Sequence, residues 1–429
     1  MTHSNTPNAT VPRWQPATLG IMAILCIWAL SPEIRRLVDW RAGFSLVSIF
    51  SVLPLLALLA PLVALIYGGG LARVDRRLAA IAWIWFGGFT SALAVAVVSG
   101  TEISAALYSY ATFCLPAVFG LWVASLETER SLLFERVARF LLMLAAPLAL
   151  YAIAQLAYPP PWDVAWMLQA RLPSMGPPLP FQFRPFSTLN GPAVFADFLV
   201  AVILLNLPRL RNASPVLLLQ VGLCGGALAL TMVRSGWLGL TVGVACFLAL
   251  GSNRLANLTA LAFAALAFYG VTNALPNFIG ASNVGGGLGA RLSSLSQLDS
   301  DASYVDRERY LGEPLREAAA TPQGSGLGII GNATKLGSTG AAEYLDNGYI
   351  ARLTEMGWFG TACYLVAGLG ALVYVLSQRG AVPAAVIGAA AAIQVDLMTL
   401  DLSGDSRSSL GGMVFWLSLA LVSRRVSLP

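Results

Sequence analysis

Long apolar runs recur along almost the whole chain, and they constrain its fold more than any other feature. Each run has about 16 to 25 residues, which is enough for a helix to cross a hydrocarbon core of roughly 30 Å. With 57% hydrophobic and only 11% charged residues, a soluble domain of 429 residues would expose its core to water. The runs also lack the alternation of lipid-facing strands. The sequence therefore predicts an all-α integral membrane protein.

We expect one polytopic membrane domain over residues 1–429, built as a bundle of about twelve transmembrane helices. Two polar segments predict large loops, at residues 159–192 and 276–346, and the second has apolar residues at helical spacing, which indicates a partly helical loop at the membrane face. The expected spans are Ala17–Leu30, Phe44–Tyr67, Leu78–Val98, Ile103–Leu126, Phe140–Ala157, Ala193–Leu207, Val216–Met232, Trp237–Leu250, Leu258–Leu275, Gly357–Leu376, Val382–Leu400 and Gly411–Val422.

Arginines at the ends of the apolar runs predict the orientation of the chain. With both termini in the cytoplasm, nearly all short loops that carry arginine fall inside, as the positive-inside rule requires. Both large loops then fall outside. One group of arginines, Arg35, Arg36 and Arg41, falls on the outer face and is an exception to the rule.

The residue types at the outer face limit the chemistry that is available there. His3 is the one histidine and lies in the N-terminal tail, so we expect neither an imidazole base nor a metal or other cofactor. The proton acceptor of any base-assisted step is then a carboxylate or the substrate itself. All five cysteines lie in expected spans, as small apolar residues. The formal charge of +5 is spread over loop ends, which indicates no nucleic-acid partner.

Four segments place an arginine or a carboxylate at the outer end of an expected span: residues 184–191, 231–237, 306–307 and 346–360. Taken singly, such an arginine commonly extends toward lipid headgroups. Together they would gather several guanidinium groups on one membrane face, which suits bidentate binding of a phosphate or pyrophosphate. A glycine turn at residues 323–331 could let backbone amides approach a ligand. Its Gly-x-Gly-x-x-Gly pattern is not a dinucleotide site, because no strand precedes it.

The order of these segments resembles the O-antigen ligase and polymerase superfamily over roughly residues 184–364. An arginine, a small residue and an asparagine precede one span, and an arginine follows a Thr-x-x sequence before another. An outer-loop arginine, a Thr-Pro-x-Gly-x-Gly-Leu-Gly segment and an Asp-Asn-Gly-Tyr segment then follow. The matching residues are Arg184, Ser187, Asn190, Arg234, Arg307, Thr321–Gly328 and Asp346–Gly360.

The resemblance implies a polytopic glycosyltransferase of the GT-C type in a bacterial inner membrane. Such enzymes act at the outer face on a glycan linked to undecaprenyl pyrophosphate, and transfer it to a glycan or a lipid-linked acceptor. Polysaccharide export machinery is a further implied partner, besides the lipid bilayer. Ligases of the superfamily have a histidine before the asparagine of the last motif, where this chain has Asp346. This difference favours an exopolysaccharide polymerase-like branch.

We therefore expect an inverting, metal-independent transfer in which an acceptor hydroxyl attacks the anomeric carbon and expels the pyrophosphate. Asp346 would accept the hydroxyl proton or only orient the hydroxyl, and Asn347 would hold the sugar. Arginine suits the leaving group because its charge persists at physiological pH and its fork matches phosphate oxygens. The expected pyrophosphate and sugar ligands are Arg184, Asn190, Arg234 and Arg307, with Arg291, Arg309 and Arg352 as second choices.

Two other classes of function stay open. A transporter is favoured by ionisable residues within or near spans, namely Asp197, Glu355, Asp396 and Asp401. The lack of an internal repeat and the size of the second outer loop oppose it. The third class is a non-catalytic partner in polysaccharide export, which turnover of a lipid-linked oligosaccharide by the purified protein would exclude.

Overall fold

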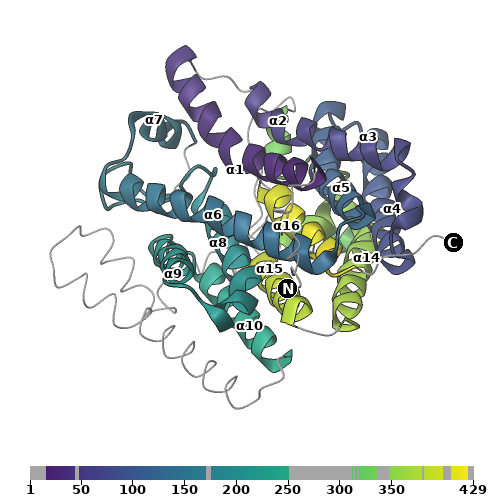
Figure 1. Ribbon diagram of the computed structural model, residues 1–429. Coiled ribbons are helices and arrows are strands. Elements are labelled where there is room, and N and C mark those ends of the chain that lie inside the picture. The colour runs from purple at the N-terminus through teal and green to yellow at the C-terminus, as the bar shows by residue number, and fades with distance from the viewer. Residues whose placement is uncertain are drawn as a thin grey trace, which may run out of the picture.

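A computed structural model describes residues 16–43, 48–170, 175–250, 312, 315–316, 318–336, 347–378, 381–399 and 407–423. Within these ranges the chain is a bundle of helices without a strand, which confirms the all-α prediction for this part of the protein (Figure 1). The expected span Leu258–Leu275 lies outside the described residues. So do four of the predicted site residues, Arg291, Arg307, Arg309 and Asp346.

Seven helical segments are long and apolar enough to cross a membrane, judged by length and composition over the described residues. They are α1 (Pro16–Ala42), α2 with α3 (Ile49–Ala57 and Leu59–Tyr67), α4 (Arg76–Val98), α5 (Ile103–Ser125), α6 (Arg130–Ala157), α8 with the 3-10 turn η3 (Pro192–Asn206 and Leu207–Asn212) and α14 (Gly348–Leu376). Four further helices have shorter apolar stretches: α9 (Pro215–Leu230), α10 (Arg234–Leu250), α15 (Ala381–Thr399) and α16 (Arg407–Val422).

Each expected span other than Leu258–Leu275 coincides with one of these helices, and the total of about twelve spans stays a prediction. Three helices extend well beyond the expected spans at the ends that carry charge, and one of them is α6, which begins at Arg130 and not at Phe140. Helix α1 continues past Leu30 to Ala42 and includes Pro32. Helix α14 begins at Gly348, so the expected first residue of that span, Gly357, lies inside the helix at a kink. The apolar runs therefore mark the membrane-spanning part and leave out the charged helix ends.

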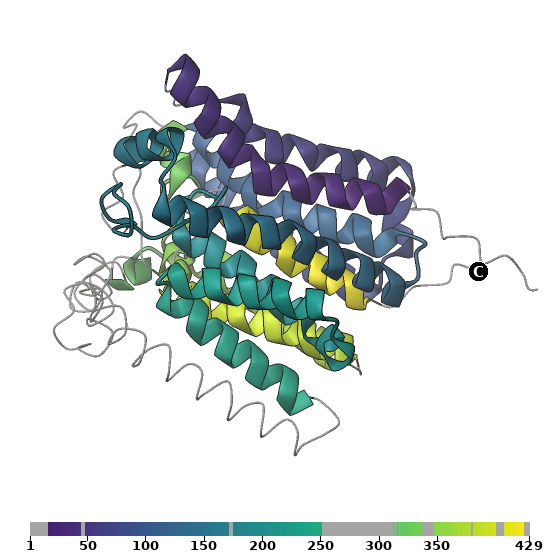
Figure 2. The ribbon, with the colours of Figure 1, turned by 60° about the vertical axis from the view of Figure 1, so that its left-hand side comes forward.

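Helices that alternate in direction bring several connecting segments to one end of the bundle (Figure 2). We call it the loop-bearing end. It consists of the short helix α7 (Pro161–Ala170), residues 175–191, residues 231–233, residues 318–336 and Asn347. The opposite end carries the start of α1 and the end of α16, together with Arg73, Arg76, Arg77, Arg130 and Arg209. The positive-inside rule would place the loop-bearing end outside, and that orientation stays a prediction.

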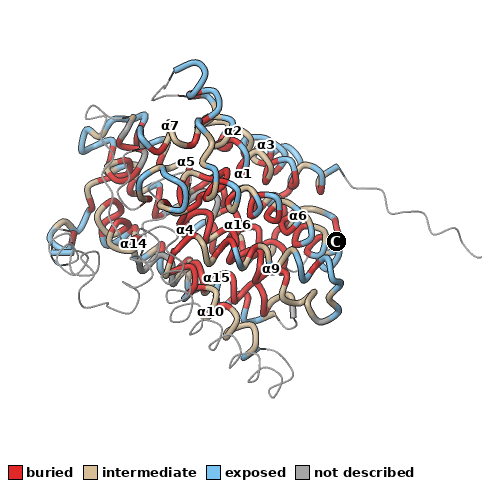
Figure 3. Tube along the Cα trace, turned by 90° about the vertical axis from the view of Figure 1, so that its left-hand side faces the viewer, coloured by how far each residue is buried: buried red, intermediate tan, exposed pale blue. Residues whose placement is uncertain are grey.

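Buried residues run through the middle of the bundle and exposed residues lie on its periphery (Figure 3). Much of the exposed surface is apolar, with Ile66, Leu219 and Leu369 exposed by 59%, 72% and 63%. Water would make such a surface costly, because monomeric soluble proteins rarely expose large contiguous apolar areas. The bundle is therefore built for a lipid surrounding.

Glycines set the closest contacts between three pairs of packed helices. A Cβ added at Gly88 of α4 would lie 3.0 Å from the carbonyl oxygen of Gly360 on α14. A Cβ at Gly243 of α10 would lie 2.8 Å from the carbonyl oxygen of Gly388 on α15, and one at Gly120 would lie 2.7 Å from a backbone oxygen of α16. Small residues at such crossings let membrane helices approach closely, so these three positions hold the bundle together.

Replacing Gly88 with leucine should lower the free energy of unfolding by about 1–3 kcal/mol, because the new side chain would overpack the α4–α14 crossing. Heat-induced loss of the monodisperse protein in detergent would measure the change. Gly87 is the matched control, since a Cβ at this neighbouring position meets nothing within 4 Å. Equal losses in Gly88→Leu and Gly87→Leu would contradict the crossing as described.

Candidate functional site

Five of the predicted site residues are described, and all five lie in segments or helix ends at the loop-bearing end. Arg184 and Asn190 lie in the segment before α8, Arg234 is the first residue of α10, and Asn347 and Arg352 lie at the start of α14. The fold therefore brings segments far apart in the sequence to one end of the bundle. The chemical roles of these residues stay predictions.

Asn347 is the residue that begins α14. Its backbone is extended, and its side-chain Oδ1 accepts hydrogen bonds from the backbone N–H groups of Tyr349 and Ile350, at 3.0 and 3.1 Å. This is the arrangement of a helix N-cap. The side-chain oxygen Oδ1 is used by the cap. The sugar contact that we expected from Asn347 would therefore have to come from the side-chain NH2 group.

The glycine turn interlocks with α14 where that helix is kinked. Gly357 has φ 62° and ψ −166°, which interrupts the hydrogen bonds of the helix. The N–H of Trp358, which in a regular helix donates to Thr354, instead donates to the carbonyl of Pro322 at 2.9 Å. In exchange, the N–H of Ser325 donates to the free carbonyl of Thr354 at 2.8 Å. The turn and the helix thus satisfy each other's backbone hydrogen-bonding groups at the kink.

Two further amides of the turn bind the same residue of α14. The N–H of Gly326 donates to the backbone carbonyl of Glu355 at 3.0 Å, and the N–H of Gly328 donates to its side-chain Oε1, also at 3.0 Å. This corrects our expectation that the glycine turn frees its amides for a ligand. The amide of Ser325 binds a carbonyl group that the kink leaves without its usual donor, and the amides of Gly326 and Gly328 bind the backbone and the side chain of Glu355.

The glycines of the turn are required by the backbone of the bundle itself. Gly326 has φ 92°, and a Cβ there would lie 2.4 Å from Cα of Ala96 on α4. Gly328 has φ 91°, and a Cβ there would lie 2.6 Å from the carbonyl carbon of Ala105 on α5. Between them Leu327 is fully buried in the main core. The turn is therefore inserted among α4, α5 and α14.

Arg352 and Glu355 form a buried ion pair directly below this turn. The distance between Arg352 Nη1 and Glu355 Oε2 is 2.6 Å, and the two side chains are only 2% and 1% exposed. The guanidinium group also lies over the ring of Phe113, 4.4 Å from its centroid. Glu355 joins the pair to the turn through Gly328. Arg352, a second choice for binding pyrophosphate, thus has a partner within the fold.

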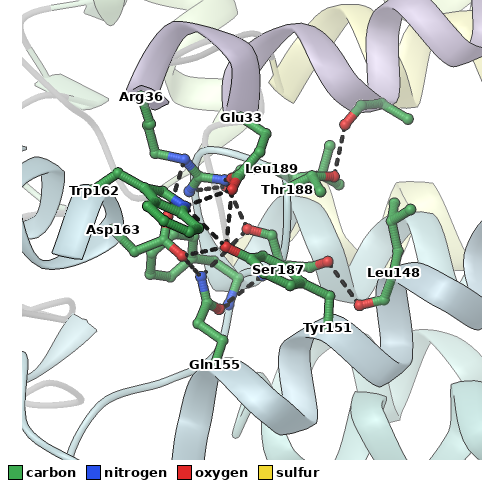
Figure 4. Close-up of polar contacts among 12 residues, drawn as sticks. Glu33, Arg36, Leu148, Tyr151, Gln155, Trp162, Asp163, Ser187, Thr188 and Leu189 are labelled. Atoms are coloured by element: carbon green, nitrogen blue, oxygen red, sulfur yellow. Dashed lines mark hydrogen bonds and ion pairs between the residues drawn. The ribbon is translucent and has the colours of Figure 1, made fainter. Parts of the chain in front are cut away.

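A second buried network, which we did not predict, centres on Arg36 of α1 (Figure 4). Its Nε lies 3.2 Å from Asp163 Oδ1, and the side chains of both residues are fully buried. Its Nη1 donates to the carbonyl of Leu189 at 3.1 Å, and its Nη2 donates to the carbonyl of Ser187 at 2.8 Å and to Glu33. The guanidinium group therefore joins α1, α7 and the segment before α8.

Gln155 of α6 holds the same segment from the other side. Its Oε1 accepts from the N–H groups of Phe186 and Ser187, at 3.1 and 3.0 Å, and its Nε2 donates to Asp163 Oδ2 at 2.7 Å. Ser187 has φ 54°, an uncommon conformation for a residue other than glycine. The backbone between Arg184 and Asn190 is thus bound by side chains of two helices.

The hydroxyl group of Tyr151 on α6 links Glu33 and Asp163. The Tyr151 hydroxyl oxygen lies 2.8 Å from Glu33 Oε1 and 2.7 Å from Asp163 Oδ2. Burial raises the pKa of Asp163, against the opposing effect of Arg36 and with a further increase from Glu33.

We expect Asp163→Asn to weaken the pH dependence of stability. The pKa of Asp163 is raised in the folded protein, so its contribution is complete below the unfolded pKa of about 3.9 and is lost as pH rises through the folded pKa. Asparagine imitates the protonated acid and removes this loss. Thermal unfolding in detergent at a series of pH values above about 4 would measure the slope.

The control for this pH experiment is Glu102→Gln, since Glu102 is an exposed carboxylate. We expect this control to keep the slope of the unaltered protein. Equal slopes in Asp163→Asn and the unaltered protein would contradict a raised pKa of Asp163 in the folded protein.

One signal in the sequence pointed to the Arg36 network. Arg35, Arg36 and Arg41 are the exception to the positive-inside rule, and Arg36 has its charge balanced by Asp163 and Glu33 rather than exposed to a lipid headgroup. Glu33 precedes it by one helical turn, which is the spacing of an ion pair within a helix. Asp163, Tyr151 and Gln155 carried no such signal, because their contacts join segments that are distant in the chain.

Among the described residues, no group of three or more His, Cys, Asp or Glu side chains is placed to hold a metal ion. The five cysteines are free and lie in the helices of the bundle. The arrangement at the loop-bearing end thus consists of arginines, amides, carboxylates and glycine backbone. Comparison of the chain with protein-family models, with curated proteins and with solved structures finds no match.

Proposed function

We propose that this protein is a membrane glycosyltransferase that polymerises or ligates glycans carried on undecaprenyl pyrophosphate. The observation that supports the proposal best is the interlocking of two segments that carry the family resemblance, Thr321–Gly328 and Asn347–Gly360. The backbone N–H groups of Ser325, Gly326 and Gly328 in the first segment donate hydrogen bonds to the kinked start of α14 in the second. The two segments are thereby joined by hydrogen bonds at the loop-bearing end.

The proposed reaction is an inverting displacement at the anomeric carbon. An acceptor hydroxyl forms the new glycosidic bond, the bond from that carbon to the pyrophosphate oxygen breaks, and the pyrophosphate leaves on its lipid. Asp346, which directly precedes the helix cap Asn347, accepts or orients the hydroxyl proton. Arg184 and Arg234, both at the loop-bearing end, bind the leaving pyrophosphate through their planar donors.

One residue that favoured a transporter has a structural role in the fold. Glu355 is paired with Arg352 and bound to the glycine turn. An ionisable residue within a span usually marks a transport path when it faces a cavity or binds an ion. The environment of Glu355 is that of a structural ion pair, which supports transfer over transport.

Asp346→Ala and Arg234→Ala should each reduce polymer formation by about 10² to 10³ fold, as loss of one transition-state contact typically does. Cells that lack their own copy and carry each variant at equal membrane abundance would be compared by the chain lengths of the extracted polysaccharide. Arg77→Ala is the control, because this arginine is exposed at the opposite end of the bundle.

Wild-type chain lengths from both variants would remove Asp346 and Arg234 from the mechanism. Purified protein that moves a lipid-linked oligosaccharide between leaflets without forming a glycosidic bond would support the transporter instead. Purified protein that does neither would support the non-catalytic partner.

A further inference from the structure

Arg36 binds the segment before α8 through backbone carbonyl groups. Its two terminal nitrogens donate to Ser187 and Leu189, at 2.8 and 3.1 Å. The same segment is fixed near its beginning by a separate bond, in which the N–H of Arg184 donates to the carbonyl of Met175 at 2.9 Å. Arg36 therefore controls the later part of the segment, which leads to Asn190 and to the first turn of α8.

We propose that Arg36 is a positioning residue that sets the backbone between Arg184 and Asn190 for binding a lipid pyrophosphate. The link to a lipid pyrophosphate rests on the proposed function, whereas the control of the backbone rests on the hydrogen bonds alone. Arg36 itself is fully buried and paired with Asp163, so it acts through the segment and does not touch the ligand.

The backbone of this segment needs such support because of its conformation. Ser187 adopts φ 54°, which an L-residue occupies at a cost. Its N–H is bound by Gln155 at 3.0 Å, its carbonyl by Arg36, and its hydroxyl donates to the carbonyl of Leu148 at 2.7 Å. A conformation held by donors and acceptors from three sides is one that the surrounding structure determines, and Arg36 supplies the charged contact.

Lysine could not replace Arg36 in its hydrogen bonds to the carbonyl groups of Ser187 and Leu189. The guanidinium carbon Cζ lies 4.8 Å from the ring centroid of Phe186 and 5.5 Å from that of Trp166, and these two rings pack against each other. Its nitrogens reach two carbonyl groups and two carboxyl groups at once. A lysine ammonium is a compact point charge without a fork, so it cannot hold both carbonyl groups in the same geometry.

Two measurements on variants of Arg36 test the proposal. The first uses Thr188→Cys, at a residue that is buried inside the segment, and follows the rate of its labelling by a maleimide in membranes. The second measures the affinity of the purified protein, without the added cysteine, for undecaprenyl pyrophosphate in nanodiscs. Both are made for Arg36→Gln and Arg36→Lys, with Arg41→Gln as the control, since Arg41 is exposed at the end of α1 over Trp40.

We expect Arg36→Gln and Arg36→Lys to raise the labelling rate at least tenfold and to weaken binding of undecaprenyl pyrophosphate at least tenfold. Arg41→Gln should change neither. The paired replacement of the cation and its acids, Arg36→Met with Glu33→Gln and Asp163→Asn, provides a variant that folds if the single changes do not, because it removes Arg36 together with both of its acidic partners. It should show the same faster labelling and the same weaker binding.

The outcomes separate the two levels of the proposal. Unchanged labelling in both the single and the paired variants would overturn the control of the backbone by Arg36. Faster labelling with unchanged affinity would overturn its role in ligand binding. If the unaltered protein does not bind undecaprenyl pyrophosphate, the proposed function fails, while the labelling result still decides whether Arg36 positions the segment.

Discussion

Replacing Glu355 with alanine should lower the free energy of unfolding by about 3–5 kcal/mol, which is the typical cost of removing one member of a buried ion pair. Glu355 and its partner Arg352 are 1% and 2% exposed, so the substitution leaves a buried guanidinium group without its carboxylate. It also removes the acceptor of the Gly328 N–H. Denaturant titration of the purified protein in detergent would measure the loss.

The double variant Arg352→Met with Glu355→Leu is the informative comparison. Because it removes both charges and fills the space with apolar atoms, we expect it to recover most of the stability lost in Glu355→Ala. A double variant as unstable as Glu355→Ala would contradict the ion pair as the cause. If the double variant folds and loses polymer formation, Arg352 also serves the ligand; if it keeps polymer formation, the role of Arg352 is structural.

Replacing Gly326 with alanine should cost about 2–5 kcal/mol of unfolding free energy and abolish polymer formation. Of this, about 1–2 kcal/mol comes from a positive φ in a residue with a Cβ. The remainder, about 1–3 kcal/mol, is overpacking. The new atom would lie 2.4 Å from Cα of Ala96, which is backbone and cannot turn aside. Activity should fall further than stability, because the turn would separate from α14 and release Glu355.

Gly43→Ala separates the two causes. Gly43 has the same φ as Gly326, 92°, yet a Cβ there meets nothing within 4 Å. This control should therefore lose only the part due to backbone conformation, and it should retain polymer formation. Equal losses of stability in Gly326→Ala and Gly43→Ala would show that the turn is not inserted against α4.

The pattern of apolar runs was sufficient to predict the helices, since every described helix that is long enough to cross a membrane coincides with such a run. It failed at their ends, where charged residues continue a helix. Hydropathy reports which atoms favour lipid, and Glu33, Arg36 and Asp39 of α1 do not. They remain helical because their charges are balanced within the fold.

In the candidate site too, the sequence predicted some features and not others. The order of motifs predicted that Arg184, Asn190, Arg234 and Asn347 belong together, and the alternation of the helices places them at one end of the bundle. The meaning of the glycine turn could not be read from its pattern. The amides of Gly326 and Gly328 are as suitable for a phosphate as for a protein oxygen, and only the folded structure shows that both meet Glu355.

The sequence by itself predicted the lipid surrounding of this protein, its helical class and the candidate segments, because these follow from local composition and from the length of apolar runs. The tertiary structure alone decided the partners of the buried charges. Arg36 meets Asp163, and Gly328 meets Glu355, across long separations in the chain. No local pattern encodes such pairs, since the free energy of a buried charge depends on which group packing brings against it.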